Sequence, residues 1–168
     1  MSRSPFLHHI GDLLRDRAEP RDVDVVASVE WHVELSRVLP DPPLDAELTL
    51  SPMPGGILVR GQVRGVARHT CHRCIDEWDE PFDVAVAQLF AHPDSATEDD
   101  YLIERDELDL EAAIRDEVLL AMPLVPTCGD DCPGLVDDSE SDLNTDVPEA
   151  DDSRSPFAVL KDLFEPGQ

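Results

Sequence analysis

Two pairs of cysteines restrict the folding of this chain more than any other feature. Cys71 and Cys74 lie in the sequence CHRC, and Cys128 and Cys132 lie in TCGDDC. Either spacing lets both thiols of a pair bind one metal ion with little strain, and zinc in structural sites takes four ligands in a tetrahedron. Because 53 residues separate the pairs, the fold must bring two distant loops together. We predict a structural zinc site formed by all four cysteines.

The residues around the first pair leave other uses of the thiols open. Cys-x-x-Cys also occurs in redox dithiols, but those normally open a helix, whereas polar IDEWDE follows Cys74. Four reduced thiols without metal are a second alternative. A catalytic zinc would need an open coordination position and a nearby general base. His69 and His72 flank the pair, but we expect solvated histidines at a strand end. Since the sequence contains no other catalytic motif that we recognise, we expect no enzymatic activity.

The chain is strongly acidic, with a formal net charge of -25 over 168 residues. Residues 94–152 contain 21 Asp or Glu side chains but only Arg105 and Arg115 as basic residues. Such a surface repels a phosphate backbone, so we expect no autonomous binding to naked nucleic acid. Charge complementarity speeds encounter with oppositely charged proteins, and we therefore predict a basic protein partner.

Neither membrane insertion nor secretion is indicated by the sequence. No apolar run approaches the roughly 20 residues that a membrane span requires. The first residues, MSRSPFLHHIGDLLRDR, lack an uninterrupted apolar stretch and a small-residue cleavage site. We therefore expect a cytoplasmic protein without a membrane partner. In that reducing compartment, four cysteines favour metal binding or redox work over disulfides.

An antiparallel sheet is predicted over residues 22–91. Strands are indicated by the β-branched residues of VDVVASVEWHVELS and LDAELTLS, and SPMPGG is typical of a turn. The alternation of residues 57–70 predicts one long strand that leads directly into Cys71, and residues 82–91 predict another. The first cysteine pair is thus expected in the connection between two antiparallel neighbours.

Helical spacing of apolar residues predicts one main helix over residues 109–122, with Asp109 as its cap and prolines after its end. Its apolar stripe consists of Leu110, Ala113, Ile114, Val118, Ala121 and Met122. Two Ser-Pro helix starts predict short helices at the ends of the chain, one from Ser4 and one over residues 155–164.

These patterns predict an α+β fold, in which the antiparallel sheet is packed by one main helix and flanked by short terminal helices. Residues 1–126 are expected to form the α+β domain. Residues 127–153 contain few apolar and many acidic side chains, which predicts an acidic, cysteine-containing loop that is mostly disordered. Residues 154–168 are expected to form a short docking helix.

Several of these segments together resemble the bacterial YceD family, the large ribosomal RNA subunit accumulation proteins. The resemblance is carried by RHTCHRC, FDVAV, LDLEAAIRDEVLLAMPLVP, the loop from Cys128 to Leu135 and the terminal SPFAVLKDL. It covers most of residues 57–164 and is weaker in the N-terminal third. In many relatives two further cysteines stand where this chain has Val136 and Ser139. The resemblance therefore implies an alternative in which the family's zinc ligands include that cysteine pair, which this chain lacks, so that Cys128 and Cys132 are inadequate substitutes and the site is vestigial.

What the resemblance implies is a non-enzymatic accessory factor for the synthesis, processing or stability of large-subunit ribosomal RNA. Together with the acidic charge, it implies a basic ribosomal protein or another assembly factor as partner. An alternative from a different class is a zinc-stabilised regulatory module whose acidic segment, residues 127–153, binds a basic client. A metalloenzyme is the third hypothesis.

Overall fold

The computed structural model describes residues 4–15, 18–98 and 100–134. All of them belong to the first of the two units into which the chain divides, residues 1–135. The predicted disorder of residues 135–153 and the predicted docking helix at 154–168 lie outside the described residues, as do Val136 and Ser139.

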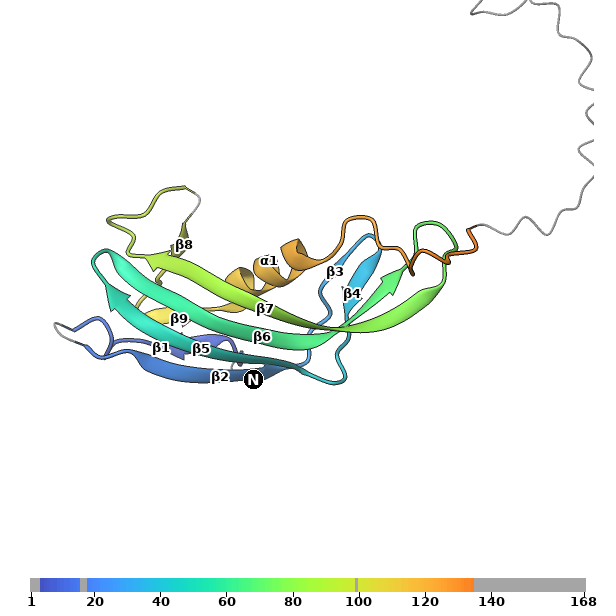
Figure 1. The fold of residues 1–168 in the computed structure, drawn as a ribbon. Helices are drawn as coiled ribbons and strands as arrows, with labels where there is room; N and C mark the ends of the chain where they lie inside the picture. Colours follow the sequence, from blue (N-terminus) through green and yellow to red (C-terminus); the bar gives the residue numbers. More distant parts are fainter. Residues whose placement is uncertain (1–3, 16–17, 99, 135–168) are drawn as a thin grey trace, which may run out of the picture. The chain divides into compact units, whose positions relative to one another are not determined.

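A seven-stranded sheet forms the main layer of the fold (Figure 1). Its strands are β2 (Arg21–Ala27), β3 (His32–Val33), β4 (Ser36–Val38), β5 (Leu44–Met53), β6 (Gly56–Thr70), β7 (Glu77–Ala91) and β8 (Tyr101–Leu102). The central strand β6 pairs with β7 on one side and with β5 and β4 on the other. All pairings are antiparallel except the short one between β7 and β8.

The long hairpin of β6 and β7 follows from alternation in the sequence. Successive side chains of a strand point to opposite faces, so Val59 and Val63 are buried while Arg60 and Arg64 are exposed. Fifteen residues of β6 pair in register with β7, from Gly56 opposite Ala91 to Thr70 opposite Glu77. The predicted strand at 82–91 therefore begins earlier than expected, and the hairpin ends at the first cysteine pair.

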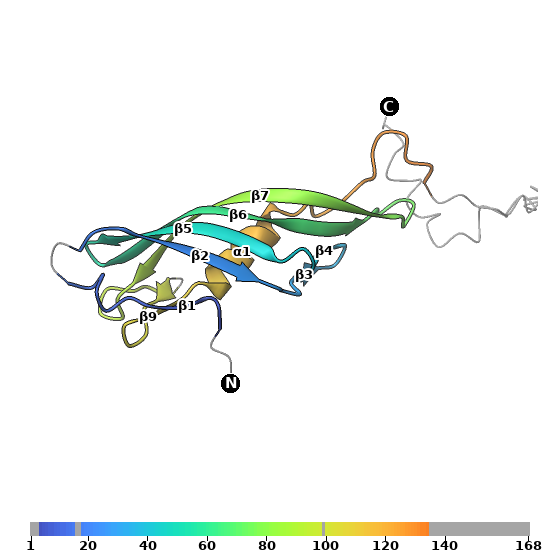
Figure 2. The same ribbon diagram turned by 90° about the horizontal axis from the view of Figure 1, so that it is seen from below.

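One face of the sheet is covered by α1 (Glu111–Ala121) and by a small second sheet (Figures 1 and 2). The helix buries Ala113, Ile114 and Val118 of the predicted stripe, whereas Ala121 is exposed. The helix is shorter than the predicted 109–122, and the predicted cap at Asp109 is wrong. The N-cap is Leu110, without a side-chain cap hydrogen bond, while Asp109 lies just before it and accepts a hydrogen bond from the Glu111 amide. One continuous core lies between the helix and the inner face of the sheet.

The predicted N-terminal helix is wrong. Residues Leu7–His9 form strand β1, which pairs with β9 (Glu107–Asp109) in the second sheet. The apolar residues that suggested a helical face, Phe6, Ile10 and Leu13, are nevertheless buried in the core. A Ser-Pro start is compatible with several backbone conformations, and here pairing with a strand about one hundred residues away decides between them.

The described part of the chain is thus an α+β fold, mostly antiparallel sheet with one helix. No helix in this part is both long enough and apolar enough to cross a bilayer. The architecture places the turn between β6 and β7 near the segment that follows α1 (Figure 1).

Candidate metal centre

The first cysteine pair lies in the tight connection between β6 and β7. Two backbone hydrogen bonds close this loop: the Cys71 amide donates to the Asp76 carbonyl at 2.9 Å, and the Ile75 amide donates to the Cys71 carbonyl at 3.0 Å. Ile75 has a φ of 68°, which a β-branched residue rarely adopts. The strained turn folds Cys74 back towards Cys71.

The second pair follows α1 and reaches the same place. Met122 ends the helix in an extended conformation, and the chain then runs to Pro126. There the His72 amide donates a hydrogen bond of 3.0 Å to the Pro126 carbonyl. Beyond it, Gly129 has a φ of 130° and the Cys132 amide donates to the Gly129 carbonyl at 3.3 Å. The chain bends tightly at this glycine, because only glycine readily takes such a conformation.

All four thiols converge on one point. Their sulfur atoms lie within 4.8 Å of one another. Cys71 Sγ is 3.6 Å from Cys132 Sγ, and Cys74 Sγ is 3.6 Å from Cys128 Sγ. These separations are too long for disulfides, and all four cysteines are free. A tetrahedron with zinc–sulfur bonds of about 2.3 Å has sulfur–sulfur edges of about 3.8 Å. The arrangement is therefore compatible with a structural metal ion.

The protein stabilises a negative charge on Cys71 within this cluster. Backbone amides of Cys74 and Arg73 favour the thiolate of Cys71 and, despite its burial, lower its pKa to about 5. The Asp76 amide lowers the pKa of Cys74, but burial and the neighbouring thiol groups together outweigh it and raise that pKa to about 12. Hydrogen bonding with Cys132 raises the pKa of Cys128. Like charges at this distance cannot all persist without a cation, and a divalent ion would remove that conflict.

The chemistry of this donor set is that of a closed site. Four thiolates fill a tetrahedron, so a bound ion keeps no position for water or substrate. Cys71 is fully buried, whereas Cys128 is exposed at the rim. The most direct consequence of binding would be mechanical, because an ion shared by the two pairs ties the loop after α1 to the end of the β6–β7 hairpin.

The two histidines beside the first pair have structural contacts. His69 is only 4% exposed, so the expectation of a solvated residue is wrong for it. Its Nδ1 lies 2.7 Å from the Ser36 hydroxyl, which joins β6 to β4. His72 is exposed, and its Nδ1 donates to the Pro126 carbonyl at 3.1 Å. The alternation of residues along β6 places His69 on the inward face, so the sequence could have predicted its burial. No local sequence pattern indicates the hydrogen bond from His72 to Pro126.

Comparison with known proteins now identifies the family. The family model of the large ribosomal RNA subunit accumulation protein YceD matches residues 59–164. The chain belongs to the YceD family. The matched range includes β7, α1 and all four cysteines, and it therefore contains the whole candidate metal centre.

Curated relatives occur among mycobacteria. Uncharacterized proteins of Mycobacterium bovis and Mycobacterium tuberculosis are each 40% identical over 100 residues, which cover 55% of this chain and 47% of each relative. An uncharacterized protein of Mycobacterium leprae is 31% identical over 131 residues, covering 74% of this chain and 60% of the relative. The chain thus spans about half the length of the first relatives it matches. No solved structure matches it significantly.

Proposed function

We propose that this protein is a non-enzymatic, cytoplasmic accessory factor in the synthesis, processing or stability of large-subunit ribosomal RNA. The observation that carries the proposal is the YceD family match, which extends over residues 59–164. The closed arrangement of four thiols supports it, because a site of this kind holds loops together and leaves no position for catalysis.

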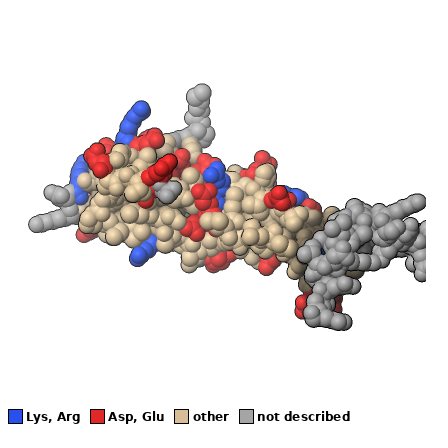
Figure 3. Space-filling model, turned by 90° about the horizontal axis from the view of Figure 1, so that it is seen from above, with Lys and Arg blue, Asp and Glu red and all other residues tan. Residues whose placement is uncertain are grey.

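The proposed partner is a basic ribosomal protein or another assembly factor. Acidic side chains cover more of the face seen in Figure 3 than basic ones do. Arginines are also neutralised locally, since each of Arg21, Arg37, Arg64, Arg68 and Arg115 forms an ion pair with a carboxylate. A surface of this kind attracts cationic proteins and repels free phosphate backbones.

The proposed metal is zinc, bound by Cys71, Cys74, Cys128 and Cys132. Thiolate sets of this kind select zinc or iron–sulfur chemistry, and the spacing of each pair is that of structural zinc sites. Elemental analysis of protein purified without a metal-chelating tag should find about one zinc per chain. Well-folded protein without any metal would contradict the proposed ligand set.

The function is tested in a strain from which the gene has been deleted. We expect less mature large-subunit ribosomal RNA relative to small-subunit RNA, restored by expression of the full chain. Immunoprecipitation of the chain from growing cells should recover large-subunit precursors or their proteins. An unchanged RNA ratio, together with recovery of neither, would refute the proposed function.

The cysteine cluster also supports a second candidate, a zinc-stabilised regulatory module whose acidic segment binds a basic client. Cys128 and Cys132 anchor the beginning of that segment, residues 127–153, to the hairpin end. Deletion of residues 137–153, which leaves the cysteines intact, distinguishes the two. Loss of client binding in the deletion variant favours the module, whereas unchanged binding leaves the segment as a linker.

A further inference from the structure

An apolar groove runs between β7 and the C-terminal half of α1. It has a volume of about 330 Å³. Phe82 of β7 lines one side, and Val118 and Met122 line the other. Val118 and Met122 also belong to the core, so the walls of the groove are fixed by packing that the fold itself requires. The groove is therefore present before any ligand arrives.

A carboxylate lies at the mouth of this groove. Glu80 lines it with a side chain that is 61% exposed, and its Oε2 lies 4.0 Å from Nε2 of His69, which also lines the groove. The side chain of Asp83 points instead to the outer face of the sheet, where it pairs with Arg64 at 3.3 Å. Glu80 accepts a hydrogen bond from the indole of Trp78, and none of the described residues that line the groove is Lys or Arg. An occupant with positive charge beside its apolar part would complement this rim.

Exposed leucines stand next to the lining residues in the sequence. Leu120 and Leu124 are 82% and 90% exposed, and they flank the lining residues 121–123. Single exposed apolar residues are common, but two large ones beside groove-lining residues are a feature of interaction sites. The hydrogen bonds between His72 and Pro126 hold the segment that follows Leu124 against the hairpin end.

The groove borders the free edge of β7, and that edge is poorly suited to recognition by backbone pairing. The Leu39 amide donates to the Val66 carbonyl, so the polar backbone groups of Val66 point away from β7. Pro81 of β7 lies opposite Val66 in register, so the nitrogen of Pro81 points to the free edge of β7. Proline has no hydrogen on this nitrogen and cannot donate a backbone hydrogen bond there. Side chains must carry recognition at this point.

We propose that this groove binds the apolar face of a Lys- or Arg-rich amphipathic segment of a protein partner. The apolar side chains of the segment occupy the groove between Phe82 and Met122 and cover Leu120, and its cations face Glu80. Apolar burial supplies affinity, and Glu80 together with the net negative charge of the chain supplies selection for basic proteins. The inference rests on the proposed partner class and assigns it a surface that is separate from the four thiols.

Two matched double variants of the full chain test the groove. Glu80→Lys with Leu120→Ser alters the mouth of the groove and the exposed leucine next to lining residue Ala121. Val26→Ser with Asp45→Lys alters an exposed apolar and acidic pair, opposite each other in register between β2 and β5, in the same way. The probe is the set of basic proteins extracted from purified large ribosomal subunits and treated with nuclease. Urea midpoints and metal content of both variants establish that they fold.

We expect the wild-type chain and the Val26/Asp45 variant to retain the same ribosomal protein, and the Glu80/Leu120 variant to retain it at least about tenfold less well. If both variants retain the protein equally, or if the wild-type chain retains no basic protein, the proposal that the groove binds the partner is wrong.

Complementation of the deletion strain separates the proposed groove from the proposed function. If the groove variant restores ribosomal RNA fully, the groove is wrong and the function stands; if the wild type restores nothing, the function fails.

Discussion

Cys71 is the thiol that is best prepared to bind a metal ion. It is fully buried, and its Sγ accepts a hydrogen bond from the Arg73 amide at 3.5 Å. Backbone amides hold its pKa at about 5, so it is a thiolate at neutral pH, whereas Cys74 needs the cation to ionise. Metal binding would therefore begin from one preformed charge and displace the proton of Cys74.

Substitution of Cys71 by serine removes this preformed ligand. We predict that Cys71→Ser lowers zinc affinity by at least about tenfold, because a neutral hydroxyl replaces a thiolate in a closed tetrahedron. Competition with a colorimetric chelator measures the change. Thr127→Ser, a substitution beside Cys128 that changes no thiol, is the matched control. Equal affinity in both variants would show that Cys71 is not a ligand.

The spacing of the cysteines was enough to nominate four residues that the structure brings together. Cys-x-x-Cys and Cys-x(3)-Cys are local patterns. Each lies in a loop that is held in place by a neighbouring strand or helix with an ordinary sequence pattern. The sequence did not reveal how the second loop is held. That depends on the His72 amide and ring meeting the Pro126 carbonyl, a contact across 54 residues for which no local pattern exists.

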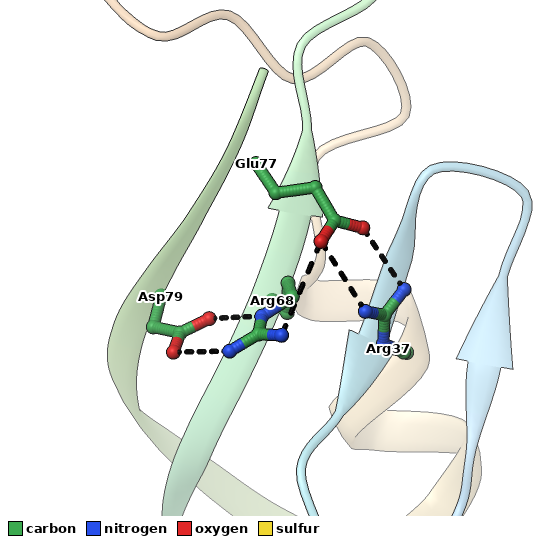
Figure 4. A network of polar contacts seen from close by, with 4 residues as sticks. All are labelled: Arg37, Arg68, Glu77 and Asp79. Atoms are coloured by element: carbon green, nitrogen blue, oxygen red, sulfur yellow. Dashed lines mark hydrogen bonds and ion pairs between the residues drawn. The ribbon is translucent and has the colours of Figure 1, made fainter. Parts of the chain in front are cut away.

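At the scale of elements, a network of ion pairs joins β4, β6 and β7 on the exposed face of the sheet (Figure 4). Arg68 Nη2 lies 2.7 Å from the Asp79 carboxylate, and Arg37 Nη1 lies 3.2 Å from Glu77. Arg68 also approaches Glu77, at 3.9 Å. The register places these residues in neighbouring rows at the hairpin end, where β4 adds the third strand.

The network predicts a pH dependence. The guanidinium of Arg68 lowers the pKa of Asp79 in the folded protein, so the carboxylate contributes stability above the pKa of the unfolded chain, near 3.9. That contribution is lost as the pH falls through the folded pKa. We therefore predict that Asp79→Asn lowers the urea midpoint at pH 7 and that the difference from wild type shrinks as the pH falls below about 3.9.

Two controls accompany this measurement. Asp45→Asn, an exposed carboxylate of the same face, should change the midpoint less at each pH. Since surface ion pairs are screened, about 1 M salt should also reduce the effect of Asp79→Asn. Loss of metal in acid affects wild type and variant alike and cancels in the difference. An Asp79→Asn effect that does not shrink as the pH falls below about 3.9 would contradict an ionic origin.

The middle of β6 depends on a glycine. A Cβ atom at Gly61 would lie 2.0 Å from the Glu47 carbonyl oxygen and 2.8 Å from Leu48 Cα, both backbone atoms of β5. We predict that Gly61→Ala lowers the free energy of unfolding by about 1–3 kcal/mol, because the strands must separate locally. Urea denaturation measures it, with Arg60→Ala as an exposed neighbour expected to change stability by less than about 0.5 kcal/mol. An equal effect of both would refute this close approach.

The sequence correctly predicted those strands and helices whose own residues show a clear strand or helix periodicity. Strand β6 alternates between valines facing the core and arginines facing solvent, and α1 repeats its apolar residues at helical spacing. Strand β1 is different, since its pairing partner is β9, far along the chain, and no local pattern records that pairing. The groove beside α1 was likewise absent from the sequence predictions, because it arises from how the helix packs against β7.

For the described unit as a whole, the candidate metal centre and the core are separate. The core extends over the inner face of the sheet and includes Val63, Leu48 and Ile114, and of residues 122–134 only Met122 belongs to it. The four thiols lie at the end of the β6–β7 hairpin, where the sheet consists of β3, β4, β6 and β7. Bound metal should therefore fix the loops at this end while the sheet folds on its own core.

Removal of the metal tests this separation. With a strong chelator present, we predict that the His72 amide, which donates to the Pro126 carbonyl, exchanges its hydrogen at least about tenfold faster. Amides in the paired centres of β5 and β6, such as that of Leu48, should keep their exchange rates, because the apolar contacts that protect them do not involve the thiols. Hydrogen-exchange mass spectrometry of the full chain measures both, and re-addition of zinc should restore the slow rate. Faster exchange throughout the sheet would mean that the metal governs the whole fold, since the core would then be too small to hold the strands without it.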